Sequence, residues 1–424
     1  MLKGLLPAWV EADPLRSRAT DPLGLQNVAD RLADRLLPGL SVLTTRARYF
    51  SFFCWARDAT GPGYNERQIH RCEVALALTE KSLSDADPEH AEYCRFVGSR
   101  NIEFFEQGQV PTDPRRVYKM PAWRAYRPSL SAVGLVDSAS GFSLTEAGAA
   151  LSSAFRRAVR PRWKPPRPFS AAACLSCSSD DERRQLRDVL GLSMGGPLDA
   201  DSADPRIRRA VFVREMRKTH PNDGLSPEVV LPGYEGLRSP NLPEPARTLR
   251  VAAVWERLSF GLNAVFVSWL RAVDAGTCTS FERTLAKLLT GRLPQPTLEP
   301  TELSAQNQVP ALARAVSSLR HAIRLHDQLD ECHAMLKDED AFELARNLVS
   351  SRQAPRVRVA KTINDLRSRH LAAKGDEAWV RECPDGELEL ARDGGETWKM
   401  PSAVRPHAYR MAAFHQIAFD LGGL

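Results

Sequence analysis

The sequence predicts a mainly α-helical protein of several domains, with a small internal α+β module and a β-ribbon near the C-terminus. The chain has 424 residues, more than one domain usually holds. In most segments the apolar residues recur every three or four positions, the period of a helix with one buried face. Only two segments combine short apolar strands with turn residues. The apolar share of 43% and the charged share of 26% are ordinary for a globular protein and exclude a fibrous or wholly disordered chain.

These patterns divide the chain into four expected parts. Composition changes mark the boundaries, above all a stretch rich in proline and arginine near 160–170. We expect a helical N-terminal domain at 1–108, an α+β module at 109–160, a basic, proline-rich linker and loop region at 161–245, and a helical C-terminal domain with the β-ribbon at 246–424.

Four helices are predicted in the N-terminal part. They cover 25–37, a segment that starts at Thr44 or Thr45, 65–82 and 89–107. The second of these helices carries Arg46 and Arg48 in its first turn, where a cation opposes the helix dipole. Both arginines therefore need an anionic partner. A carboxylate of the same chain is the simpler candidate, and a phosphate is the alternative.

The α+β module is predicted from a helix that ends at Val133 and a hairpin that turns at 137–141. Gly134-Leu135-Val136 precedes the turn, and Thr145 is expected to cap the helix that follows. The phrase Leu-Thr-Glu-Ala-Gly at 144–148 at this spacing resembles the winged helix-turn-helix superfamily. That resemblance implies a module that contacts either DNA or a protein. The turn carries an acid and no Lys or Arg, whereas a wing that grips phosphate usually offers cations.

Basic residues gather in three patches, at 115–127, 156–167 and 206–218. Pro161, Pro165 and Pro166 keep the second patch extended, and Trp163 offers a ring on which a base can stack. The alternative for this patch is a solvated linker. The candidate DNA-binding residues are Arg115, Arg116, Lys119, Arg124, Arg127, Arg156, Arg157, Arg160, Arg162, Trp163, Lys164, Arg167, Arg206, Arg208 and Arg209.

The C-terminal part is predicted to be built around one long helix at 244–272, which is apolar around most of its circumference and therefore central. Further helices are expected at 280–290, 309–325, 341–348 and 358–371, and a final one at 407–421. The β-ribbon is expected at 377–392, with its turn at Pro384-Asp385-Gly386.

Motifs for nucleotide, dinucleotide, serine-hydrolase, metalloprotease and kinase chemistry do not occur in the sequence. We expect no cofactor and no metal. Cys174 and Cys177 form a single pair, whereas a structural zinc site needs a second pair or nearby histidines. His321 and His326 lie about 140° apart around a helix and do not face one metal. Glu387 and Glu389 on the ribbon lack the lysine that a restriction-type nuclease needs.

The longest apolar stretch, 258–270, is shorter than the about 20 residues that a membrane-spanning helix needs. The N-terminal segment lacks the pattern of a signal peptide. We therefore expect a cytoplasmic protein that does not enter membranes, with its eight cysteines reduced.

The phrase DPLGLQNVADRLADRLLPGLSVLTTRARYFSFFCWA at 21–56 and the final DLGGL resemble a group of uncharacterised bacterial proteins associated with antiviral defence loci and mobile elements. That resemblance implies a non-catalytic subunit that works beside ATPases, nucleases or helicases. The phrase is carried by Asp21, Gly24, Arg46, Arg48, Tyr49 and Trp55.

The first hypothesis is therefore a non-catalytic subunit of such a defence or mobile-element system that binds or senses DNA through its arginine-rich patches. The expected partners are DNA, with little sequence specificity, and protein subunits of the same operon. The second hypothesis is a helical adaptor whose winged helix docks partner proteins, and the third is a metal-dependent nuclease. DNA binding requires the arginines to form one cationic surface. If they lie against the chain's own acids instead, the adaptor hypothesis is favoured.

Overall fold

The computed structural model shows a mainly helical protein, as predicted. It describes residues 21–41, 43–61, 65–87, 121–159, 169–176, 178–219, 225–237, 239, 242–291, 308–374, 378–382, 388–390, 407 and 409–422. Within these residues there are fifteen α-helices and two antiparallel pairs of short strands. None of the helices in the described part of the chain combines the length and apolar character needed to cross a membrane. The helix predicted at 89–107 and the turn predicted at 384–386 lie outside the described residues.

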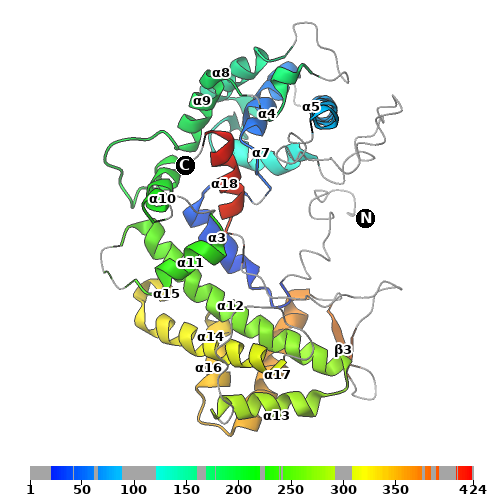
Figure 1. The fold of residues 1–424 in the computed structure, drawn as a ribbon, viewed down its shortest axis with the longest axis vertical. Helices are drawn as coiled ribbons and strands as arrows, with labels where there is room; N and C mark the ends of the chain where they lie inside the picture. Colours follow the sequence, from blue (N-terminus) through cyan, green and yellow to red (C-terminus); the bar gives the residue numbers. More distant parts are fainter. Residues whose placement is uncertain are drawn as a thin grey trace.

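Helix α4 is the centre of the N-terminal half, and its neighbours surround it in the upper part of Figure 1. Ten of its twelve residues are buried. Their rings pack among themselves and on Tyr126 and Phe155, with ring centroids 4.9–6.2 Å apart. The helices of this half are α3 (Gln26–Leu36), α4 (Arg48–Ala59), α5 (Glu66–Ala86), α7 (Ala122–Ala132), α8 (Glu146–Arg156) and α9 (Asp180–Leu190).

The start of α4 differs from the prediction. Ala47 is its N-terminal flanking residue and no side chain caps it. Thr44 Oγ1 instead accepts a hydrogen bond from the Ser41 amide and donates one to the Ser41 carbonyl, both at 2.9 Å. The hydroxyl of Thr44 is therefore used in a turn before the helix. The predicted start at Thr44 or Thr45 is wrong, because α4 begins at Arg48.

Between α7 and α8 lie two short strands, β1 (Val136–Asp137) and β2 (Ser143–Leu144), which pair antiparallel. Thr145 caps α8 as predicted, because its side chain accepts a hydrogen bond from the Gly148 amide. A Cβ on Gly148 would lie 2.1 Å from the carbonyl oxygen of Leu135. Only glycine lets α8 approach the chain that closely.

The long helix α12 (Glu244–Asp274) is the spine of the C-terminal half, and 23 of its 31 residues are buried. This confirms the predicted central helix. Figure 1 shows α14 running alongside it in the lower part of the molecule. A Cβ on Gly261 of α12 would lie 2.5 Å from Leu319 Cγ of α14, so the two helices meet at a small residue.

Shorter elements complete this half and join it to the other. No sequence pattern predicted α9 in the N-terminal half, or α11 and α15 in this half. The elements are α10 (Pro205–Thr219), α11 (Pro227–Glu235), α13 (Cys278–Leu289), α14 (Gln308–Gln328), α15 (Asp330–Met335), α16 (Glu339–Val349), α17 (Pro355–Lys374), β3 (Val380–Glu382), β4 (Leu388–Leu390) and α18 (Met411–Asp420).

Two buried ion pairs at the start of α4 join three distant parts of the sequence. Arg46 Nε lies 2.8 Å from Asp420 Oδ2 at the end of α18. Arg48 Nε and Nη2 donate to the two carboxylate oxygens of Glu182 on α9, each at 3.1 Å. The side chains of Arg48 and Glu182 are only 2% and 1% exposed. The partners expected for Arg46 and Arg48 are therefore carboxylates of the same chain.

The neutral imidazole of His370 on α17 ties the N-terminal segment to the chain before β3. Its Nδ1 lies 2.8 Å from the Pro22 carbonyl oxygen, and its Nε2 accepts a hydrogen bond of 2.8 Å from the Trp379 amide. This pattern requires a proton on Nδ1 and none on Nε2. Burial lowers the pKa of His370 to about 4.

Replacing Glu182 tests the ion pair to Arg48. The substitution Glu182→Gln keeps the shape but leaves the buried guanidinium without a countercharge, so we expect a loss of about 3–5 kcal/mol in the free energy of unfolding. Urea unfolding followed by tryptophan fluorescence measures it. The neighbouring Asp181→Asn, which removes surface pairs to Arg157 and Arg184, is the matched control and should cost at most about 1 kcal/mol. Equal losses in the two variants would contradict the expectation that the buried pair stabilises the protein more than the surface pairs do.

Acidification tests the His370 contacts. The folded pKa of about 4 lies below the ordinary value of 6.5, so the stability that His370 contributes is fully present above pH 6.5. It is lost as the pH falls from 6.5 towards 4, because only the unfolded chain takes up the proton there. The difference between the two pKa values corresponds to about 3 kcal/mol in the free energy of unfolding. Urea unfolding at both ends of this window should show a smaller pH effect for His370→Gln than for the unaltered chain; the same pH effect in both would contradict the assignment.

Candidate functional site

Fifteen residues were predicted to contact DNA, and the structure describes seven of them. Those outside the described residues are Arg115, Arg116, Lys119, Arg160, Arg162, Trp163, Lys164 and Arg167. The seven described residues fall on three helices, α7, α8 and α10. Each already has a partner within the chain.

The two arginines of α7 lie on a helix that is packed inside the protein. Arg124 Nε is 3.0 Å from Glu66 Oε1 on α5, and the Arg127 guanidinium carbon lies 5.1 Å from the centre of the Phe142 ring. Of the α7 residues, only Pro128 and Ala132 are exposed. A recognition helix has to enter the major groove with one face free, so this packing is not compatible with α7 reading DNA.

Arg156 and Arg157 end α8 and are both half-exposed, with 59% of each side chain accessible. Arg156 forms an ion pair with Asp58, and Arg157 forms one with Asp181. On α10, Arg206 and Arg208 lie 3.7 Å from carboxylate oxygens of Asp204 and Glu244 respectively. These four cations are accessible to a ligand, but each has an acid beside it that neutralises its charge locally.

Arg209 has a structural role. Its side chain is fully buried, and its three nitrogens donate to the carbonyl oxygens of Leu190, Pro38 and Val189 at 2.9, 2.6 and 3.2 Å. The last carbonyls of a helix have no partner within that helix, and Arg209 satisfies those at the end of α9. Burial lowers the pKa of Arg209 to about 10. The prediction that Arg209 contacts a phosphate is not compatible with this position.

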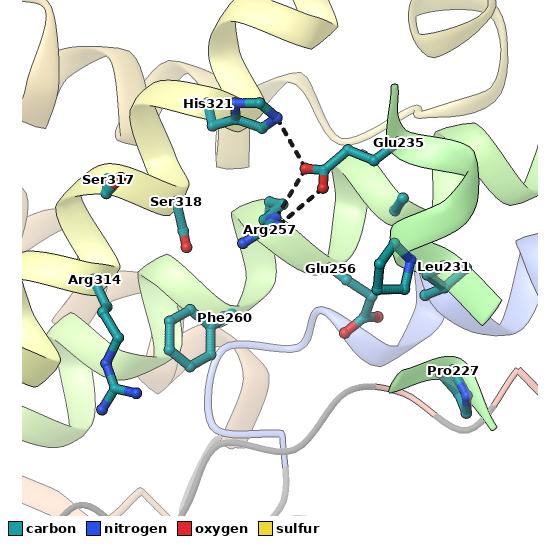
Figure 2. Close-up of a pocket in the computed structure, with 12 residues that line it drawn as sticks. Pro227, Leu231, Glu235, Glu256, Arg257, Phe260, Arg314, Ser317, Ser318 and His321 are labelled. Carbon is teal, nitrogen blue, oxygen red and sulfur yellow. Dashed lines mark hydrogen bonds and ion pairs between the residues drawn. The ribbon is translucent and has the colours of Figure 1, made fainter. Parts of the chain in front are cut away.

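A pocket of about 630 Å³ lies between α11, α12 and α14 and is shown in Figure 2. Apolar side chains form part of its wall, and polar and charged side chains converge on it. The pocket is lined by Pro227, Leu231, Pro232, Glu235, Ala253, Glu256, Arg257, Phe260, Arg314, Ser317, Ser318 and His321.

Acids and their partners occupy one end of this pocket. Glu235 accepts hydrogen bonds from Arg257 Nε and Nη2 at 2.8 and 2.9 Å and lies 3.0 Å from His321 Nε2. Glu256 accepts a hydrogen bond from the Tyr409 hydroxyl at 2.7 Å and lies 2.5 Å from His407 Nδ1. Burial lowers the pKa of His407, but the hydrogen bond and the charge of Glu256 outweigh it and raise the pKa above its ordinary value. These charges are satisfied within the protein.

Arg314 differs from the other charged groups of the pocket. Figure 2 places it at the opposite end from Glu235. Among the described residues its guanidinium has no carboxylate within ion-pair distance, and its buried Nε has no hydrogen-bond partner. Ser317 and Ser318 follow it on α14, and Phe260 of α12 also lines this wall. Arg314 was not among the predicted site residues; the available signal in the sequence was a single cation inside the apolar run at 310–316.

The histidines and cysteines that were weighed as metal ligands lie in different surroundings. His321 faces Glu235 in the pocket, whereas His326 is fully buried against Phe342, with ring centroids 3.8 Å apart. The two do not share a site, as the helical spacing predicted. Cys174 is buried beside Ser176, and Cys177 lies outside the described residues.

Comparison of the chain with models of protein families, with curated proteins and with solved structures gave no match in any of the three.

Proposed function

We propose that this chain is a helical adaptor subunit of a multi-protein assembly, and that the pocket between α11, α12 and α14 holds a segment of a partner subunit. The observation that carries the proposal is Arg314, a partly buried guanidinium without a countercharge among the described residues. A buried N–H group without an acceptor costs about 1–3 kcal/mol. A ligand that supplies the acceptor recovers that free energy on binding.

The chemistry of the pocket defines the segment that would fit. A carboxylate can form two parallel hydrogen bonds with the Arg314 guanidinium. The hydroxyls of Ser317 and Ser318 offer further donors, and Phe260 and Leu231 offer apolar surface. We therefore propose a segment in which an acidic side chain, or a C-terminal carboxylate, is adjacent to an apolar side chain.

The resemblance of 21–56 to bacterial proteins of defence loci and mobile elements supplies the context for this proposal. In that context the partner would be encoded beside this chain. The segment from α7 to α8 would serve as a reduced winged-helix module that packs inside the protein, because α7 is covered by α4 and α5. No step of this proposal requires the chain to be a catalyst.

DNA binding is a second candidate, favoured by one observation. Arg156 and Arg157 are half-exposed at the end of α8, directly before the basic run at 160–167. Surface ion pairs contribute about 0–1 kcal/mol, so phosphates can replace Asp58 and Asp181 at little cost. The contact set is then the end of α8 and the run that follows it. Arg124, Arg127 and Arg209 are left out, because their positions are taken up by packing.

Reversing the charge of Arg314 tests the adaptor. The tagged full chain is expressed with its native operon, and proteins retained with it are quantified by mass spectrometry. We expect the product of an adjacent gene to be retained in a fixed ratio, and retention to fall at least about tenfold in Arg314→Glu. Arg283→Glu, an exposed arginine on α13, is the matched control and should retain the partner fully. Equal retention by both variants, or no retained protein at all, would overturn the proposal.

Gel shifts with duplex and single-stranded DNA test the second candidate. If Arg156, Arg157 and the four cations of the run at 160–167 bind phosphates, the counterions that they release give a slope of about −5 when the logarithm of the binding constant is plotted against the logarithm of the salt concentration. The triple variant Arg160→Glu, Arg162→Glu, Lys164→Glu is then expected to abolish the shift. Arg217→Glu, an exposed residue of α10, should change the shift little. Absence of any shift at low salt would remove DNA from the function and leave the adaptor.

A further inference from the structure

Three side chains with metal-ligating atoms meet where α14, α15 and α16 join. They are His326 near the end of α14, His333 in α15 and Glu339 at the first position of α16. One ligand atom from each lies within 4.8 Å of those of the other two. The rings of His326 and His333 stand edge to face, with centroids 4.2 Å apart.

His326 is held rigidly and keeps one nitrogen unused. The residue is fully buried, and its ring packs on Phe342. Its Nδ1 lies 3.1 Å from Arg346 Nη2 and 3.5 Å from Asp327 Oδ1. Its Nε2 is buried and has no hydrogen-bond partner. Because Arg346 Nη2 can only donate, Nδ1 accepts that hydrogen bond and Nε2 carries the ring proton. A buried N–H group without an acceptor needs an explanation, and loss of its proton leaves Nε2 able to bind an ion.

The other two ligands are able to close around such an ion. Zinc binds histidine nitrogen at about 2.0–2.1 Å and carboxylate oxygen at about 2.0–2.2 Å in a tetrahedron, which brings ligand atoms to about 3.4 Å from one another. His333 and Glu339 are exposed, so rotation of their side chains can supply the remaining ångström or so. His326 itself does not have to move.

We propose that His326, His333 and Glu339 form a zinc site with an open fourth position. Two imidazoles favour zinc and its transition-metal neighbours over Mg²⁺ and Ca²⁺, which take oxygen ligands. When Nε2 of His326 binds the metal, the ring proton moves from Nε2 to Nδ1, where Asp327 accepts it; a carboxylate commonly orients a zinc-bound histidine in this way. Arg346, which can only donate, then gives up its hydrogen bond to Nδ1. Arg346 holds that carboxylate in place through a hydrogen bond of 2.6 Å to Oδ1.

The site sits on three consecutive helices within 326–339, away from the side chains that line the pocket between α11, α12 and α14. The proposal therefore stands whether or not that pocket binds a partner. The spacing of His321 and His326 on one helix did not indicate this arrangement, because His333 and Glu339 lie beyond the break in the helix at Leu329. A bound ion would fix the corner between α14 and α16.

Zinc binding by the purified full chain tests the site. After removal of metals with a chelator, the chain is titrated with Zn²⁺ in competition with a chromogenic chelator. We expect one tightly bound equivalent, and affinity at least about tenfold lower in both His333→Ala and Glu339→Gln. Both substituted residues are exposed, so these variants should fold. His321→Ala on α14 and Glu343→Gln on α16 are the matched controls and should bind as the unaltered chain does.

Cobalt distinguishes this site from adventitious binding at cysteines. A four-coordinate Co²⁺ centre with nitrogen and oxygen ligands gives visible d–d bands without a thiolate-to-metal charge-transfer band. We expect that spectrum in the unaltered chain and its loss in Glu339→Gln. Failure to bind zinc, binding that both His333→Ala and Glu339→Gln leave unchanged, or a thiolate charge-transfer band would each overturn the proposal.

Discussion

The arrangement of the N-terminal half depends on two buried arginines at the start of α4. Taking a charged group out of water costs free energy, which a countercharge with good geometry or several hydrogen bonds must offset. Arg46 therefore requires Asp420 and Arg48 requires Glu182, so α4 can be buried only when α18 and α9 are both in place. Ser51 adds a hydrogen bond to Glu182, and the Ala47 amide adds one of 3.0 Å to Asp420. Arg46 and Arg48, which belong to the N-terminal phrase at 21–56, thus act inside the protein. Arg48 joins a segment 134 residues further along the chain, and Arg46 joins one 374 residues further along.

The same principle separates cations that hold the fold together from cations that can serve a ligand. Arg209 donates its hydrogen bonds to three carbonyl groups. Arg250 is buried and contacts Glu331 and the Leu237 carbonyl. The arginines at the end of α8 are half-exposed and form pairs that a phosphate or a partner's acid can replace at small cost. Arg314 has no countercharge among the described residues. Counting arginines along the sequence does not distinguish these three situations, because the distinction lies in burial and in the neighbours that the fold supplies.

Local patterns in the sequence predicted much of the fold. Apolar periodicity placed α3, α5, α12 and α14, and the turn and capping residues placed β1, β2 and the start of α8. Short helices such as α11, which holds two prolines within nine residues, gave no clear period. The pocket and the cluster of His326, His333 and Glu339 could not be predicted, since their members come from different helices whose packing no local pattern encodes. For Arg46 and Arg48 the sequence indicated the need for an acid but not which one.

The central claim is that the buried arginines of α4 stabilise this protein through their own carboxylates and are not reserved for a ligand. A double-mutant cycle measures this directly: the free energies of unfolding of Arg48→Met, Glu182→Gln and the double variant are compared with that of the unaltered chain. We predict a coupling energy of about 1–3 kcal/mol between the two residues, with the double variant less destabilised than the sum of the single variants. Strictly additive losses would contradict the account, because they would mean that Arg48 and Glu182 do not depend on each other.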